Sequence, residues 1–226
     1  MKDQKTKKLT VLAMLCALSY ATTFLFHFIG LSFIPALPFL TYDPKDIIIV
    51  IGGFLYGPLA SLAISAVVST LEMLTISSTG PIGLAMNILS SCAFACTAAW
   101  IYQKKRTLLG ASLGLLTGVT SMVAVMLAWN YVLTPLYMEG ATREYIATLL
   151  VPAFLPFNLL KGAINASFTA LLYRPLVLSL RKAGLFPTKD SSSAPTQESK
   201  LLFYGITGLL IVLSVCAIFL IQHFAS

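Results

Sequence analysis

Apolar residues fill long stretches of this chain, and charged residues stand between the stretches rather than inside them. Five stretches contain no Asp, Glu, Lys or Arg, namely 9–42, 47–71, 73–103, 107–138 and 201–226. A helix needs only about 20 apolar residues to cross the hydrocarbon core of a bilayer, so each stretch is long enough for a membrane span. The pattern predicts an all-α integral membrane protein with several spans.

Prolines and polar turns divide the apolar stretches into separate helices. We expect six of them before residue 185, at about 9–29, 44–56, 58–75, 81–102, 107–133 and from an entry at 152–156 to about 180. The second is shorter than the hydrocarbon core, and Gly57-Pro58 separates it from the third. Segment 136–150 carries charged residues and is expected to lie outside the membrane.

The chain is expected to have three regions. Residues 1–185 should form a six-helix membrane core. Residues 186–200 are rich in Ser and Pro and should form a flexible polar linker. Residues 201–226 contain an additional C-terminal transmembrane helix, the seventh, at 201–222.

The segment between the first two helices is apolar but cannot be a regular helix, because it contains Pro35 and Pro38. Lipid cannot satisfy the backbone of an irregular segment, so this loop should lie on protein or over a cavity. The next four residues are typical of a helix start. Asp43 can serve as the N-cap, Pro44 can take the first helical position, and Asp46 adds a carboxylate to the first turn.

The placement of the basic residues indicates the topology. The net charge is +7, and the basic residues gather near the N-terminus, at 104–106 and at 174–200. Those places can share one side of the membrane, and basic loops stay on the cytoplasmic side. We therefore predict a multi-pass protein of the cell membrane, in contact with lipid and not with nucleic acid. Its N-terminus should be cytoplasmic and its C-terminus outside.

Common catalytic motifs are absent from the sequence. There is no G-x-x-x-x-G-K-[ST] loop for ATP, no G-x-S-x-G and no H-E-x-x-H. Cys92 and Cys96 share a helix face, but no histidine or carboxylate lies near them in sequence, so packing is favoured over a metal or redox site. We predict a protein that is not an enzyme and that holds no metal and no resident cofactor.

Polar residues interrupt three of the predicted spans near the outer side. Asn158 and Lys161 share a helix face, and Asn87 and Asn130 lie near the outer ends of two other helices. Each residue also has a simpler interpretation, because single intramembrane asparagines often join helices and an interfacial lysine can extend to water. Together, the four residues favour a pocket beneath the proline-containing loop.

Only two ionisable residues, Glu72 and Lys161, are expected within the spans. A proton-coupled carrier usually needs several buried ionisable groups, which argues against that class of protein. Glu72 also has a structural interpretation, as an ion-pair partner for Arg143 or Lys45.

Small residues recur at every fourth position on two helices. One stripe is alanine and the other glycine, and they consist of Ala13, Ala17 and Ala21, and of Gly110, Gly114 and Gly118. Each stripe permits the close approach of a second helix. Internal packing is one explanation for both stripes, and for the alanine stripe the alternative is a docking face for another membrane subunit.

The order of these features resembles the substrate-binding subunits (S components) of energy-coupling factor vitamin transporters, most closely those specific for riboflavin. The resemblance covers about residues 8–182. Besides the alanine stripe, it is carried by Pro-Phe-Leu-Thr-Tyr-Asp43, Phe54-Leu-Tyr-Gly-Pro58, Gly83 with Asn87, Asn130-Tyr131 and Pro156-Phe-Asn158-Leu-Leu-Lys161-Gly162. It implies a six-helix core that captures the vitamin from outside. It also implies a separate membrane T subunit and two ATPase subunits that supply the energy.

The resemblance further implies which residues contact the vitamin, which is then a transported substrate and not a cofactor. Matching positions assign ligand contacts to Asn87, Asn130, Asn158 and Lys161, with Phe39, Leu40 and Thr41 on the covering loop. Two features depart from the family. The turn before Pro81 lacks the acidic residue that the family often has there, and the seventh helix lies outside the usual six.

Two other functions remain open on the sequence. An S component for folate, thiamin or biotin would have a similar fold, and the pocket residues would decide between these vitamins. A membrane enzyme or a stand-alone carrier belongs to a different class, which the missing catalytic motifs and the few buried charges disfavour.

Overall fold

The computed structural model describes residues 2–32, 34, 37, 40–77, 79–138 and 140–183, together with isolated positions at 197, 204, 205, 208 and 212. The predicted linker and the predicted seventh helix therefore lie outside the described residues, apart from those isolated positions. The described chain is helical, and one isolated bridge between Ser32 and Thr41 joins the two ends of the loop after the first helix.

Seven α-helices and one π-helical turn follow one another within the described residues. They are α1 (Lys2–Ile29), α2 (Lys45–Tyr56), α3 (Pro58–Thr75), α4 (Gly80–Lys104), α5 (Leu108–Tyr137), α6 (Arg143–Leu149), the π-turn η1 (Leu150–Phe154) and α7 (Leu155–Lys182). Among the described residues, five helical segments are long and apolar enough to cross a membrane: Gln4–Ile29, Pro58–Thr75, Gly80–Lys104, Leu108–Leu136 and Arg143–Leu180. With only 12 residues, α2 is not among them.

The helix boundaries differ from expectation mainly in the outer segment. α5 continues through Pro135 to Tyr137 and does not end near residue 133. A proline so close to the end of a helix disturbs only its last turn. The expected mixed segment contains a short helix, α6, because the hydroxyl of Thr142 accepts the N–H of Tyr145 and caps it. Pro152 lies within the π-turn that joins α6 to α7.

The start of α2 is close to the expected one. The helix begins at Lys45, so Pro44 precedes it rather than occupying its first position. Asp43 Oδ1 still accepts the backbone N–H of Lys45 at 3.0 Å, which is the kind of contact expected of a capping carboxylate. Gly57, with a φ of 98°, then turns the chain between α2 and α3 in a conformation that favours glycine.

α4 lies at the centre of the bundle and packs against α2, α3 and α5. The glycine stripe makes the contact with α5 possible. A Cβ added at Gly114 would lie 2.7 Å from the carbonyl oxygen of Ala98, and one at Gly118 would lie 2.6 Å from that of Phe94. The glycine stripe is therefore internal packing, as one of the two interpretations predicted.

The alanine stripe on α1 has a different environment. α1 packs on α2 and α3 through a buried face that includes Val11 and Leu15. Ala13, Ala17 and Ala21 are exposed and point away from that face. Internal packing within the described chain does not account for this stripe.

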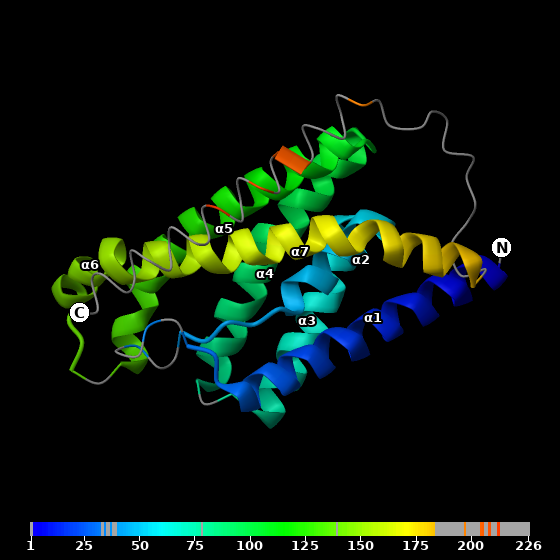
Figure 1. The fold of residues 1–226 in the computed structure, drawn as a ribbon. Coiled ribbons are helices and arrows are strands. Elements are labelled where there is room, and N and C mark those ends of the chain that lie inside the picture. The colour runs from blue at the N-terminus through cyan, green and yellow to red at the C-terminus, as the bar shows by residue number, and fades with distance from the viewer. Residues whose placement is uncertain are drawn as a thin grey trace.

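Two ends of the bundle can be distinguished in Figure 1. The start of α1, the connection between α4 and α5, and the end of α7 lie toward the same end. The loop after α1 and the short helix α6 lie toward the other end. The basic N-terminus and the basic residues at 104–106 are therefore gathered at one end of the molecule, as the distribution of charge predicts for loops on one side of a membrane.

Candidate functional site

A cavity of about 300 Å³ opens among the ends of the helices at the end of the bundle that carries the loop after α1. α1, α3, α4, α5 and α7 all contribute to its wall, and residues 40–43 of the loop complete it. Its volume is at the lower limit of typical small-molecule sites, about 300–1,000 Å³.

Every predicted ligand residue that the structure describes lines this cavity. The amides and the ammonium come from three helices and two further residues come from the loop: Asn87, Asn130, Asn158, Lys161, Leu40 and Thr41. Phe39, the remaining predicted contact, lies outside the described residues. Residues far apart in the sequence thus meet at one site, as the pocket hypothesis required.

Two of the asparagines are buried and are held by their own helices. Asn130 donates from Nδ2 to the carbonyl of Met126 at 2.7 Å, and its Oδ1 accepts the hydroxyl of Thr134 at 3.0 Å. Asn158 donates from Nδ2 to the carbonyl of Phe154 at 2.8 Å. These bonds fix the orientation of each amide, which lowers the conformational entropy that a ligand contact would otherwise lose.

Asn87 forms a hydrogen bond with a charged side chain. Its Nδ2 lies 3.3 Å from Oε2 of Glu72, and both Glu72 oxygens accept the ammonium of Lys45, at 2.7 and 2.6 Å. The sequence left two partners open for Glu72, and the structure pairs it with Lys45. Since Glu72 also lines the cavity, this ion pair forms part of the cavity wall.

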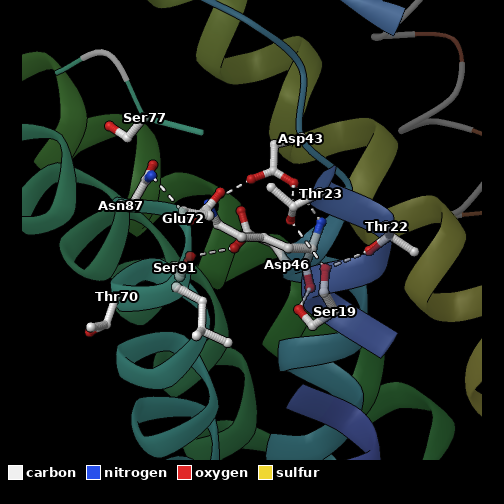
Figure 2. Close-up of polar contacts among 12 residues, drawn as sticks. Ser19, Thr22, Thr23, Asp43, Asp46, Thr70, Glu72, Ser77, Asn87 and Ser91 are labelled. Carbon is white, nitrogen blue, oxygen red and sulfur yellow. Dashed lines mark hydrogen bonds and ion pairs between the residues drawn. The ribbon is translucent and has the colours of Figure 1, made fainter. Parts of the chain in front are cut away.

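The ion pair belongs to a larger group, which we call the charge cluster: Asp43, Lys45, Asp46, Glu72 and Lys161. Lys45 Nζ also contacts Asp43 Oδ2 at 2.6 Å, and Lys161 Nζ lies 3.8 Å from Asp46 Oδ2. Figure 2 shows the three carboxylates gathered where α1, α2, α3 and α4 meet. Buried charges need such partners, because an unpaired charge in a low-dielectric interior is strongly destabilising.

The charge cluster corrects the expectation that only Glu72 and Lys161 would be ionisable at this depth. Lys45 and Asp46 are also buried, with 1% and 0% of their surface exposed, and Asp43 lies at the cavity wall. The sequence analysis had assigned the two aspartates to a helix start. A helix start explains the backbone contacts of these aspartates. It does not predict that other helices cover the start of α2 and bury the charges.

Further hydrogen bonds hold the end of the loop in place. Thr23 of α1 donates to Asp43 Oδ1 at 3.0 Å. Tyr42 donates its hydroxyl to Asn165 Oδ1 at 2.8 Å, and Asn165 Nδ2 lies 3.4 Å from the carbonyl oxygen of Asp43. The loop is therefore fixed to both α1 and α7 where it meets the cavity. Asn165 was not predicted as a site residue. The sequence did contain a signal for it, because Asn165 is one more amide in an apolar helix, one turn after Lys161.

The arrangement offers hydrogen-bonding and charged groups rather than a metal site. Within the part of the chain that the structure describes, no group of three His, Cys, Asp or Glu side chains is placed to hold a metal ion. The carboxylates of the charge cluster surround ammonium groups, while amides and hydroxyls face the cavity beside apolar side chains such as Met86, Met126 and Phe157. A wall that combines apolar side chains with a few polar groups is typical of small-molecule sites.

Comparisons with known proteins agree with this description. The sequence profile of the family described as "ECF transporter, substrate-specific component" matches residues 7–173. The riboflavin transporter RibU of Staphylococcus aureus (strain TCH60) is 32% identical over 184 residues, which is 79% of this chain and 95% of that protein. The riboflavin transporter FmnP of Bacillus subtilis (strain 168) is 29% identical over 179 residues, 75% of this chain and 91% of that protein.

A solved structure is similar over nearly its whole length. It is described as the structure and mechanism of the S component of a bacterial ECF transporter. It has a TM-score of 0.64 and 32% sequence identity, and the match covers 78% of this chain and 99% of that one.

Proposed function

The chain belongs to the family of substrate-specific components of ECF transporters, and on that premise we propose that it captures riboflavin and delivers it into the cell. It is a transport subunit and not an enzyme. The observation that carries the choice of substrate is the cavity whose wall combines Asn87, Asn130, Asn158 and Lys161. The similarity to two riboflavin transporters along most of their length supports the same choice.

The chemistry of a flavin fits this wall. Its ring system is flat and apolar on both faces, and its pyrimidine edge alternates hydrogen-bond donors and acceptors. An asparagine amide offers a donor and an acceptor in one group, so several amides on different helices can match such an edge. We propose Asn87, Asn130, Asn158 and Lys161 as the polar contacts. Phe39, Leu40 and Thr41 would then cover the ligand from the loop.

Energy for transport must come from other subunits, because the sequence has no P-loop for ATP. We propose that a membrane T subunit and two ATPase subunits supply it, and that the alanine stripe docks on them. The exposure of Ala13, Ala17 and Ala21 supports that role, since a close helix contact requires small side chains on an accessible face.

For the topology, we propose a six-helix substrate-binding core at 1–185 in which α2 is a short span, a linker at 186–200, and a seventh span within 201–226. The N-terminus is then cytoplasmic and the cavity faces outward. Single cysteines placed at Ser192 and Ser226, in a variant without the native cysteines, should be labelled from opposite sides of the membrane. Labelling of both from the same side would show that the last segment does not cross.

The test of the substrate is direct. The protein purified in detergent should carry the yellow absorbance of a flavin, and the ligand-free protein should quench riboflavin fluorescence in a saturable titration. Folate, thiamin and biotin should not compete with riboflavin. Displacement by one of these vitamins, with no saturable quenching by riboflavin itself, would assign the chain to another vitamin.

A further inference from the structure

The charge cluster is not electrically balanced. It contains three carboxylates, of Asp43, Asp46 and Glu72, but only two ammonium groups, of Lys45 and Lys161. When all five are ionised, the cluster carries one surplus negative charge. His27 is the other basic side chain among the described residues that line the cavity, and it is exposed.

Asp46 has the least compensated carboxylate of the three. Its Oδ1 accepts the hydroxyl of Ser91, but its fully buried Oδ2 has no hydrogen-bond donor among the described residues. The ammonium of Lys161 stands 3.8 Å from Oδ2, which is too far for a hydrogen bond. Lys161 lines the cavity and the buried Asp46 carboxylate is 3.8 Å from its ammonium, so this negative charge lies close to the ligand site, where dissolved salt screens it little.

We propose that the surplus negative charge makes the cavity selective for a neutral ligand over an anionic one. This inference rests on the proposed function, and it names the ligand class as an uncharged flavin that carries hydroxyl groups. Hydroxyl groups can donate to the carboxylates of the wall, whereas the phosphate ester of the same flavin brings further negative charge toward them. Asp46 and Glu72 act here as specificity determinants through their charge.

Removing a negative charge from the cluster should favour the anionic ligand, and removing a positive charge should disfavour it. Asp46→Asn keeps the shape of the side chain and still accepts from Ser91, but it removes the surplus charge. Lys161→Gln does the opposite and leaves the cluster with two surplus negative charges. General damage to the fold weakens the binding of both ligands together, so it does not move the ratio of the two affinities in opposite directions in the two variants.

The experiment measures two dissociation constants for each variant by flavin fluorescence quenching, one for riboflavin and one for riboflavin 5′-phosphate. The readout is the ratio of the phosphate constant to the riboflavin constant. It is measured at about pH 8, where imidazole side chains are mostly neutral. We expect a ratio well above one for the native protein, a fall of about tenfold in Asp46→Asn, and a rise of similar size in Lys161→Gln.

Glu144→Gln is the matched control, because it changes the net charge of the protein equally but lies on the exposed surface of α6. Its ratio should equal that of the native protein. If Asp46→Asn does not fold, Glu72→Gln removes a cluster charge at another position and should lower the ratio in the same way.

The outcomes separate the two claims. Riboflavin binding by the native protein with ratios that do not move in opposite directions would overturn the selectivity and leave the proposed function in place. An equal shift in Glu144→Gln would also overturn it, because the effect would then follow the net charge and not the cluster. Absence of riboflavin binding by the native protein would remove the proposed function and this inference with it.

Discussion

Two stripes of small residues have the same spacing in the sequence and opposite environments in the structure. On α5, Gly114 and Gly118 press against carbonyl groups of α4, so closely that a single added Cβ would clash. On α1, Ala13, Ala17 and Ala21 are exposed. The spacing therefore indicates that a helix can be approached closely, but it does not say whether the approaching helix belongs to the same chain.

The burial of the other residues on each helix shows whether its stripe packs inside the bundle. On α5, buried residues such as Leu115 and Val119 directly follow the glycines, so the stripe continues the face that packs inside the bundle. On α1, the buried positions Val11, Leu15 and Ser19 form a packing face of their own, and the exposed alanines point away from it. A helix that already has an internal face leaves a second small-residue stripe free for a partner subunit.

The largest expected effect is on the glycine stripe. Gly118→Leu would force a side chain into the space held by the carbonyl of Phe94, 2.6 Å from the added Cβ. We expect destabilisation of at least the roughly 1–3 kcal/mol that overpacking typically causes, with loss of riboflavin binding as the bundle opens. Thermal unfolding in detergent and fluorescence titration measure both.

Ala17→Leu is the matched control, since it places the same side chain on the exposed stripe. It should unfold at nearly the native temperature. Equal destabilisation by the two substitutions would remove the distinction between an internal stripe and an external one.

Ala17→Trp should separate binding from transport. A bulky side chain on the exposed stripe prevents a close helix contact, and Ala17 is not one of the residues that line the cavity. We expect normal riboflavin binding by the purified subunit and no uptake in cells that supply the T and ATPase subunits. Native levels of uptake would show that the stripe is not the docking face. Loss of binding in isolation would show that it supports the fold instead.

Substitutions in the cavity should give the complementary result. Asn158→Ala and Lys161→Ala each remove a polar partner of the ligand, which costs about 1–3 kcal/mol or roughly 5- to 150-fold in affinity. Uptake by these variants should recover at high riboflavin concentration, because docking is intact, whereas uptake by Ala17→Trp should not. Unchanged titration curves for both cavity variants would exclude these residues from the site.

Much of the fold could be predicted from the sequence, because long apolar runs and prolines are local signals. α3 begins at Pro58 and ends at Thr75 as expected. The predicted end of α5 was wrong because a proline near a helix terminus is tolerated. The helix α6 was missed because it is only seven residues long and depends on the hydroxyl cap of Thr142. Such local exceptions are decided by a few hydrogen bonds and not by the apolar pattern.

The site could be predicted only in part. The asparagines and Lys161 were found because a polar residue in an apolar helix is conspicuous and because the motifs resemble a known family. The pairing of Glu72 with Lys45 was one of the two alternatives that the sequence offered, but the rest of the charge cluster was missed because its members pair across the fold. Lys161 and Asp46, for example, come together only when α7 packs on α2. No pattern of spacing within one helix contains that information.

The smallest expected effect is that of a substitution on the exposed stripe that barely changes the size of the side chain. Ala17→Ser adds one hydroxyl oxygen, and serine is itself a usual residue at close helix contacts in membranes. If the stripe is recognised by the size of its side chains, riboflavin binding and uptake should both stay within about twofold of native, close to the ordinary scatter of a surface substitution. Uptake kinetics measured beside Ala17→Trp would show the dependence on volume. A complete loss of uptake in Ala17→Ser would mean that the partner requires an apolar surface at this position, and that small size alone is not what distinguishes the exposed stripe from the packed one.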